Sequence, residues 1–185
     1  AHVIDYQIGP GWMTVTSDAS DAYQLVNADV SRVLRTVIFM KPDVVVIYDV
    51  VEASKAVAVE ARFQVNFEDA AGQVSATGAR FEITRPNATL LARVTGKGEI
   101  KVDTGRLALD AKDGEQPFGR VTSSSATNHE ILTVCTAAPK GTAHGQLQIA
   151  RQGDNWIIAG EHHGLKMQIA IRPATKGAPT INIDG

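Results

Sequence analysis

The sequence has a single cysteine, Cys135, and its aromatic residues make up only 5% of the 185 positions. One cysteine cannot close an intramolecular disulfide, and it cannot supply the several thiolates of a cysteine zinc site. Because Cys135 lies in an alternating apolar stretch, we expect it to be a small buried side chain.

Long apolar runs and basic clusters are also missing. The apolar run from Val44 to Ile47 is far shorter than the roughly 20 residues that a membrane helix needs. The formal net charge is -2, and no basic stripe is present. We therefore expect no membrane span and no nucleic-acid partner.

The length and composition fit one globular domain that covers residues 1–185. Hydrophobic residues make up 44% and charged residues 21% of the sequence, which are ordinary values for a chain that buries one large core. The chain begins at Ala1 with neither an initiator Met nor a signal sequence. This start indicates either a processed protein or a piece of a longer one.

Apolar residues recur at every second position along most of the chain. Between residues 57 and 67 every odd position is apolar, and the even positions are mostly polar. An amphipathic helix would need apolar spacings of three and four instead. The pattern predicts a long strand with one face in a core and the other in water.

Two apolar runs before this strand are expected to form a hairpin. The runs Val30–Met40 and Val44–Val51 flank Pro42-Asp43, which is turn chemistry. The second run is apolar on both faces, which favours a central strand between two layers. Further strands are expected at 80–84, 89–95, 99–103, 107–109, 118–124, 130–137, 146–152, 156–159 and 167–171, with a loose terminal strand after residue 173. Regular strands with turn residues between them are the signature of an all-β sandwich or barrel. Of the two we predict a layered antiparallel β-sandwich, similar to a supersandwich.

The sequence contains one weak candidate for a helix, Ser20 to Asp29. Ser20 and Asp21 resemble a helix cap, but the β-branched and polar residues that follow weaken the pattern.

Five histidines could carry metal or acid–base chemistry: His2, His129, His144, His162 and His163. On a strand, the adjacent His162 and His163 would point to opposite faces, whereas in a turn they could converge with Glu161 on a metal ion. No further ligand occurs at a characteristic spacing, so an exposed turn is favoured, and metal binding there stays open. His129 stands at a strand entry and is interpreted as a surface residue.

Asp18 and Asp21 could bind calcium or act as an acid–base pair, but EF-hand spacing is absent, so a capped turn is favoured. Ser123 to Ser125 lack a G-x-S-x-G elbow, and no helix follows the glycines at 9, 11, 96 and 98 to make a phosphate loop. Asn87-Ala88-Thr89 matches a glycosylation sequon, a frequent chance match.

Trp12 and Trp156 could stack on sugar rings, but each lies in an alternating strand, which favours a core or layer-interface position. Tyr48 lies within the apolar central run and is expected to be buried. Tyr23 follows the polar loop and is the tyrosine most expected to be exposed.

The loop Asp18–Tyr23 and the hairpin Val33–Val51 resemble the heparinase II/III-like polysaccharide lyases. In that family a polar loop reading D-x-S-x-A-Y precedes a strand reading R-x-V-x-F, a turn, and an apolar strand ending in Asp. The strand motif corresponds to Arg35–Phe39 here, and the final acid to Asp49. The resemblance is strongest over residues 18–67 and is compatible as a run of strands to about residue 172.

The resemblance implies that this chain is the C-terminal β-sandwich region of a larger lyase, in a periplasmic or secreted location. The partner would be an N-terminal helical toroid of the parent chain, and the substrate an acidic polysaccharide cleaved by β-elimination. In the family, Tyr, His and Asn side chains act as base and acid, and some members hold a structural zinc. Some of these catalytic groups come from the toroid, and others from Asn-His and His-Asn-Thr motifs at the start of the sandwich.

The chain departs from the family pattern at those motifs. It has no His-Asn-Thr, and Asn128-His129 comes too late in the chain to correspond. No catalytic residue is therefore carried over. We predict no catalytic residue, no metal site and no cofactor in this chain, and the sequence assigns no substrate-binding residue.

Three other functions stay open at this point. A free-standing carbohydrate-binding module would need an exposed aromatic platform, from Trp12 or Trp156. A structural or adhesive module would need an exposed apolar face or strand edge. A stand-alone enzyme would need titratable groups that the fold brings together, and the sequence offers no such constellation.

Overall fold

The computed structural model describes residues 1–65, 71–108 and 115–184 of the chain. The elements within these residues are β1 (His2–Gly9), β2 (Trp12–Asp18), α1 (Ser20–Gln24), β3 (Val30–Met40), β4 (Val44–Gln64), β5 (Gln73–Ala76), β6 (Arg80–Thr84), β7 (Ala88–Gly96), β8 (Ile100–Ala108), β9 (Glu115–Pro139), β10 (Gln146–Gln152), β11 (Asn155–His162), β12 (Leu165–Arg172) and β13 (Thr180–Asp184). Residues 67 and 109, which the sequence places in strands, lie outside the described residues.

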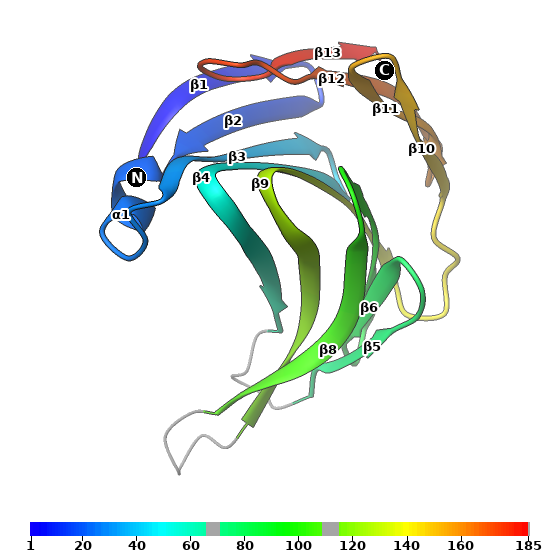
Figure 1. Ribbon diagram of the computed structural model, residues 1–185. Helices are drawn as coiled ribbons and strands as arrows, with labels where there is room; N and C mark the ends of the chain where they lie inside the picture. The colour runs from blue at the N-terminus through cyan, green and yellow to red at the C-terminus, as the bar shows by residue number, and fades with distance from the viewer. Residues whose placement is uncertain (66–70, 109–114, 185) are drawn as a thin grey trace.

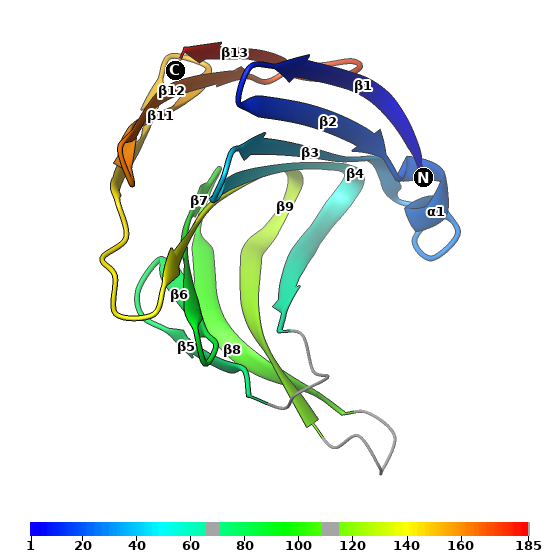
Figure 2. The same ribbon diagram turned by 180° about the vertical axis from the view of Figure 1, so that it is seen from behind.

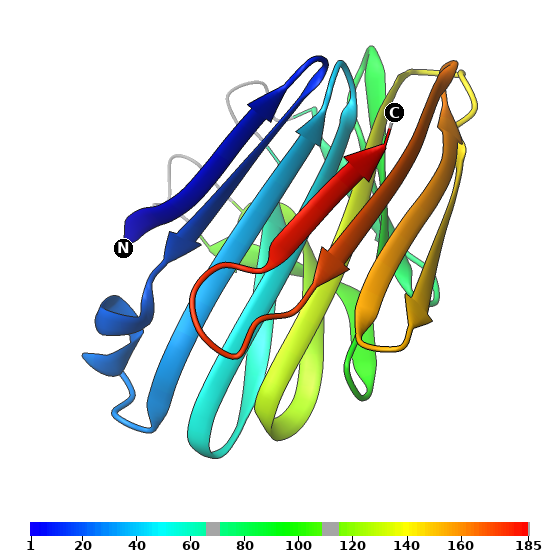
Figure 3. The ribbon, with the colours of Figure 1, turned by 90° about the horizontal axis from the view of Figure 1, so that it is seen from above.

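The strands form two antiparallel sheets that pack face to face. The large sheet has the order β1-β2-β3-β4-β9-β7-β6-β5, with β8 paired to β9, and the small sheet has the order β10-β11-β12-β13. The large sheet is strongly curved, and the small sheet covers its convex side (Figures 1 and 2). From above, β12 and β13 lie over the middle of the large sheet, where β4 and β9 run (Figure 3). The predicted layered antiparallel β-sandwich is confirmed.

The core between the two sheets follows from the alternation of β3 and β4. Ile38 and Val46 point toward the small sheet, where they meet Ile158 and Ile169, and all four are fully buried. The alternate side chains point to the concave side, because successive residues of a strand face opposite ways. A second core on the concave side surrounds Phe81. The predicted central position of the 44–51 run is confirmed.

β4 and β9 are each one long strand where the sequence analysis expected two. β4 joins the predicted 44–51 and 57–67 strands, and β9 joins 118–124 and 130–137. The two strands pair with each other on both sides of an irregular stretch between Glu52 and Val59. The polar residues Ser54 and Lys55 interrupt the apolar pattern there, but no Gly or Pro breaks the backbone.

The ends of two predicted segments also differ from expectation. α1 covers only five residues of the weak 20–29 candidate, since Leu25 and Val26 are each 89% exposed and no tertiary packing supports a longer helix. The tail after residue 173 was expected to be loose, but β13 pairs in register with β12, and Ile181 is buried in the core between the sheets.

Candidate functional site

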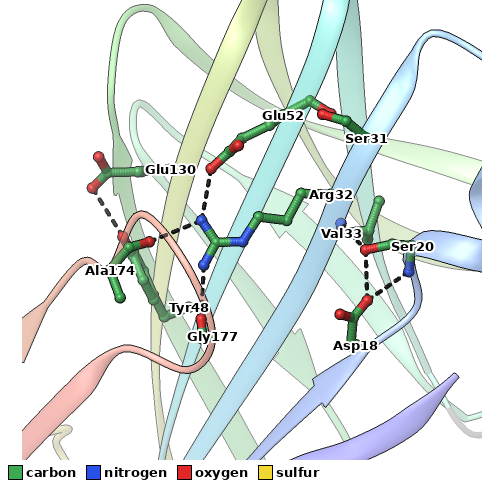
Figure 4. A network of polar contacts seen from close by, with 10 residues as sticks. All are labelled: Asp18, Ser20, Ser31, Arg32, Val33, Tyr48, Glu52, Glu130, Ala174 and Gly177. Atoms are coloured by element: carbon green, nitrogen blue, oxygen red, sulfur yellow. Dashed lines mark hydrogen bonds and ion pairs between the residues drawn. The ribbon is translucent and has the colours of Figure 1, made fainter.

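The polar loop after β2 is attached to β3 by a short chain of hydrogen bonds. The backbone N–H and the hydroxyl of Ser20 donate to Asp18 Oδ1 over 2.8 and 2.5 Å, and the Val33 N–H donates to Ser20 Oγ over 2.9 Å (Figure 4). The hydrogen bonds from Ser20 lower the pKa of Asp18. Asp18 closes the turn as predicted, but α1 has no side-chain cap hydrogen bond. The D-x-S part of the motif thus has a structural role.

Ser20→Ala should remove this attachment and destabilise the fold by about 1 kcal/mol, the usual net contribution of one hydrogen bond to stability. The Val33 amide would lose its acceptor, so its hydrogen exchange should accelerate. Urea unfolding and amide exchange would measure both effects. Ser31→Ala is the matched control, because the Ser31 hydroxyl is exposed and donates only to the Glu52 carbonyl; equal effects of the two variants would contradict the assignment.

The loop borders a hollow of about 370 Å³ on the large sheet, which we call the concave hollow. Arg35 Nε and Nη2 donate to the Asp49 carboxylate over 2.6 and 3.0 Å, and this contact raises the pKa of Arg35. Tyr23 stands beside them and is 53% exposed, as predicted. None of the described residues lining the hollow is a histidine. The hollow therefore offers a neutralised ion pair, a phenol and the Glu60 carboxylate, which is paired with Arg62, without an imidazole that could act as a general base.

His129 is buried, so its interpretation as a surface residue is wrong. Its Nε2 lies 2.9 Å from the Ala126 carbonyl and its Nδ1 lies 2.7 Å from Ser123 Oγ. Nε2 must carry the proton to reach a carbonyl, so Nδ1 accepts from the serine hydroxyl. The pair resembles a base and a nucleophile, but both side chains are only 2% exposed. No substrate can reach Ser123, which fits the prediction that this serine is not a nucleophile.

His162 is fully buried, so the prediction of an exposed turn is wrong for this residue. It ends β11, and the chain then turns through His163, whose φ is +47°. This left-handed turn brings the two rings together, with centroids 3.9 Å apart, instead of placing them on opposite faces. Asp43, from the β3–β4 turn, accepts a hydrogen bond from His163 Nδ1 over 2.8 Å. The carboxylate that joins the histidines is therefore Asp43 and not Glu161.

Asp43, His162 and His163 could be considered a metal site, since one ligand atom from each lies within 4.8 Å of the others. Asp43 Oδ1 is also buried without a partner among the described residues. However, the Gly145 N–H donates to His162 Nδ1 over 2.8 Å, and Nε2 lies 2.8 Å from the Ala137 carbonyl. Both nitrogens are therefore engaged, with the proton on Nε2. A metal could bind Nε2 only if these bonds were lost, so the geometry favours a structural histidine.

Glu130 is the central polar residue of the interior, and the sequence analysis missed it. Its Oε2 accepts from the Tyr48 hydroxyl, Arg151 Nη1 and Trp156 Nε1 over 3.0, 2.7 and 2.8 Å. Burial of Glu130 disfavours its ionisation, but these hydrogen bonds outweigh burial and hold its pKa below the ordinary value. The alternation of apolar and polar residues along β9 could have predicted the burial of Glu130, because this residue lies on the same face as Leu132 and Val134, which belong to the core.

Burial argues against Trp156 as a sugar-stacking platform, whereas Trp12 is only partly buried. Trp156 is 5% exposed and Trp12 packs against the same core. Tyr48 is buried as predicted, and Cys135 is buried, which raises the pKa of its thiol to about 12. The structure therefore argues against a platform on Trp156, and a binding module that uses Trp12 stays open.

Comparison with solved structures shows which known proteins share this fold. A heparinase III gene product matches with a TM-score of 0.67 and 13% identity over 93% of this chain. The chain has the fold of part of a heparinase. Heparan sulfate lyase HepC from Pedobacter heparinus matches with a TM-score of 0.67 and 11% identity over 97% of this chain. In both cases the chain spans 27% of the neighbour's length.

The heparinase likeness lies in the three-dimensional structure. No protein-family model matches the sequence, and no curated protein matches it significantly. Among the described residues, no helix is long and apolar enough to cross a membrane.

Proposed function

We propose that this chain is the C-terminal β-sandwich of a polysaccharide lyase of the heparinase type, without a catalytic centre of its own. In this role it would support a helical catalytic domain and form part of the wall of the substrate cleft. The observation that carries the proposal is the fold, which matches a quarter of each heparinase over nearly all of this chain. The D-x-S-x-A-Y loop supports the same assignment.

The state of the buried histidines supports a non-catalytic role. His129 and His162 have both ring nitrogens in hydrogen bonds to neighbouring groups. β-Elimination needs a base and an acid within hydrogen-bond reach of one substrate. Among the described residues that line the concave hollow there is no histidine, and both carboxylates are engaged, Asp49 with Arg35 and Glu60 with Arg62.

An exposed apolar edge supports a protein partner. Tyr6, Ile8 and Met13 are 70%, 73% and 40% exposed, and they extend the concave-side rows of the large sheet onto β1 and β2. Apolar side chains that are exposed on an edge strand are typical of a surface that a protein partner covers. We propose that the helical domain of the parent lyase covers this edge, and that the whole protein acts on an acidic polysaccharide in the periplasm or after secretion.

The proposal predicts that the isolated chain has no lyase activity. Heparin, heparan sulfate and alginate would each be incubated with the purified chain, and the ultraviolet absorbance of unsaturated uronate would be followed. We expect no increase above a blank without protein, with a complete heparinase III as the positive control. A steady increase that scales with the concentration of this chain would overturn the proposal.

A further inference from the structure

A second cavity, which we call the inter-sheet cleft, opens where the two sheets separate beside the β12–β13 loop. It has a volume of about 340 Å³, within the range of ligand pockets. Its walls come from both sheets, and its charged and amide residues include Arg32, Glu52, Lys97, Asn128, Asp154 and Arg172. The cleft is separate from the concave hollow, which lies on the other face of the large sheet.

The charges at the base of the cleft are already paired. Arg32 Nη1 donates to Glu52 Oε1 over 2.6 Å and to the Ala174 carbonyl over 2.8 Å, while Nη2 donates to the Gly177 carbonyl over 2.7 Å (Figure 4). Arg151 is paired in the same way with Glu130. These contacts fix the base of the cleft and hold the β12–β13 loop against β3, so the cavity is preorganised.

Two cations at the rim are unpaired. The side chains of Lys97 and Arg172 are exposed and form no hydrogen bond or ion pair within the described part of the chain. Their backbones are held in place, since the Lys97 N–H donates to the Glu130 carbonyl over 2.8 Å and Arg172 pairs with Thr180. Asp154 is the remaining carboxylate among the described lining residues, so the cleft keeps an excess positive charge.

The uncharged polar groups of the cleft favour a ligand with hydroxyl groups. Asn128 and Thr175 line it with an amide and a hydroxyl, which can each donate and accept hydrogen bonds. The apolar lining comes from Val50, Pro173, Ala174 and the ring of Tyr48. A hydroxylated anion satisfies both the cations at the rim and the polar walls.

We infer that the inter-sheet cleft binds an acidic sugar unit, with Lys97 and Arg172 contacting its carboxylate or sulfate group. The inference extends the proposed function by giving this domain a saccharide contact that does not depend on catalysis. It would help to retain an acidic polysaccharide on the lyase.

The test uses isothermal titration calorimetry on the whole chain with three tetrasaccharides. One carries uronate carboxylates without sulfate, one carries both uronate and sulfate, and one is neutral. The cleft variant is Lys97→Gln with Arg172→Gln. The control variant is Lys41→Gln with Lys140→Gln, which removes the same charge from two exposed lysines beside the end of the β4–β9 pair where Val44 lies opposite Thr136, outside the cleft.

We expect the acidic tetrasaccharides to bind, the neutral one to bind at least tenfold more weakly, and the cleft variant to lose about tenfold or more in affinity for the acidic ones. The control variant should bind as the wild-type chain does. Binding of only the sulfated sugar, lost in the cleft variant, would support the cleft with sulfate as the recognised group. Equal losses in both variants, equal binding of the neutral sugar, or no binding would overturn the inference. None of these results bears on the lyase assay above, so the two proposals fail separately.

Discussion

Replacing Glu130 by alanine is expected to lower the free energy of unfolding by about 3–5 kcal/mol. Three donors would lose their shared acceptor, and two of them belong to Tyr48 and Trp156, which are 1% and 5% exposed. A buried donor left without a partner costs far more than an exposed one, because water cannot replace the lost bond. Urea unfolding followed by tryptophan fluorescence would measure the change.

Glu130→Gln is the matched control, since it keeps the shape and one acceptor oxygen. We expect it to be less destabilising at neutral pH than the alanine variant. A Glu130→Ala chain within about 1 kcal/mol of the wild type would contradict the role assigned to this carboxylate.

The free energy of unfolding should also depend on pH, and it should do so differently in the wild-type chain and in the Glu130 variants. The pKa of Glu130 in the folded chain lies below the ordinary value of 4.5. A carboxyl group whose pKa is lower in the folded than in the unfolded state adds stability above its unfolded-state pKa, and that stability is lost as the pH falls through its folded-state pKa. The free energy of unfolding should therefore decrease as the pH drops below 4.5, and this decrease should be smaller in Glu130→Gln.

Replacing His162 by phenylalanine should destabilise the chain by about 2–4 kcal/mol. Phenylalanine keeps a planar ring in the core but leaves the Gly145 N–H and the Ala137 carbonyl without their partners. These bonds connect the end of β11 to β9 and to the residue just before β10, so their loss should also weaken the docking of the small sheet. Urea unfolding would measure the loss in free energy of unfolding. Faster amide exchange at Gly145 would show that the lost hydrogen bond is the one to His162.

His163→Asn is the control for this experiment. His163 is exposed enough to solvent, at 29% of its side chain, that its contact with Asp43 contributes little. Asparagine also tolerates the positive φ at this position. We expect the free energy of unfolding of this variant to differ from that of the wild type by less than about 1 kcal/mol. An equally large effect in His163→Asn, or a His162→Phe chain as stable as the wild type, would show that the hydrogen bonds of His162 are not the cause.

The strands could be predicted from sequence because their alternation reports burial directly. The hairpin of β3 and β4 is confirmed from its apolar runs and the Pro42-Asp43 turn. The joining of β4 across Ser54 and Lys55 could not be predicted, because two polar residues look like a turn unless the pairing with β9 is known. The single-domain assignment of residues 1–185 stays a prediction.

The polar interior was much harder to predict than the strands. The errors at His129 and His162 share one cause: a histidine near a strand end was assumed to be solvated. Backbone groups from distant segments satisfy the His162 ring, Gly145 from one side and Ala137 from the other, and no local pattern encodes such partners. The cluster around Glu130 likewise assembles residues from β4, β9, β10 and β11.

The continuous pairing of β4 with β9 has a consequence for how the chain folds. The register that places Val44 opposite Thr136 and Gln64 opposite Phe118 joins positions far apart along the chain. Both hydrophobic cores are built on these two strands. Neither core can therefore form before β4 and β9 have paired, which closes the chain between them into a long loop. Folding should consequently be slow, with a nucleus that contains the middle of both strands. The two cores should then melt together as a single cooperative unit.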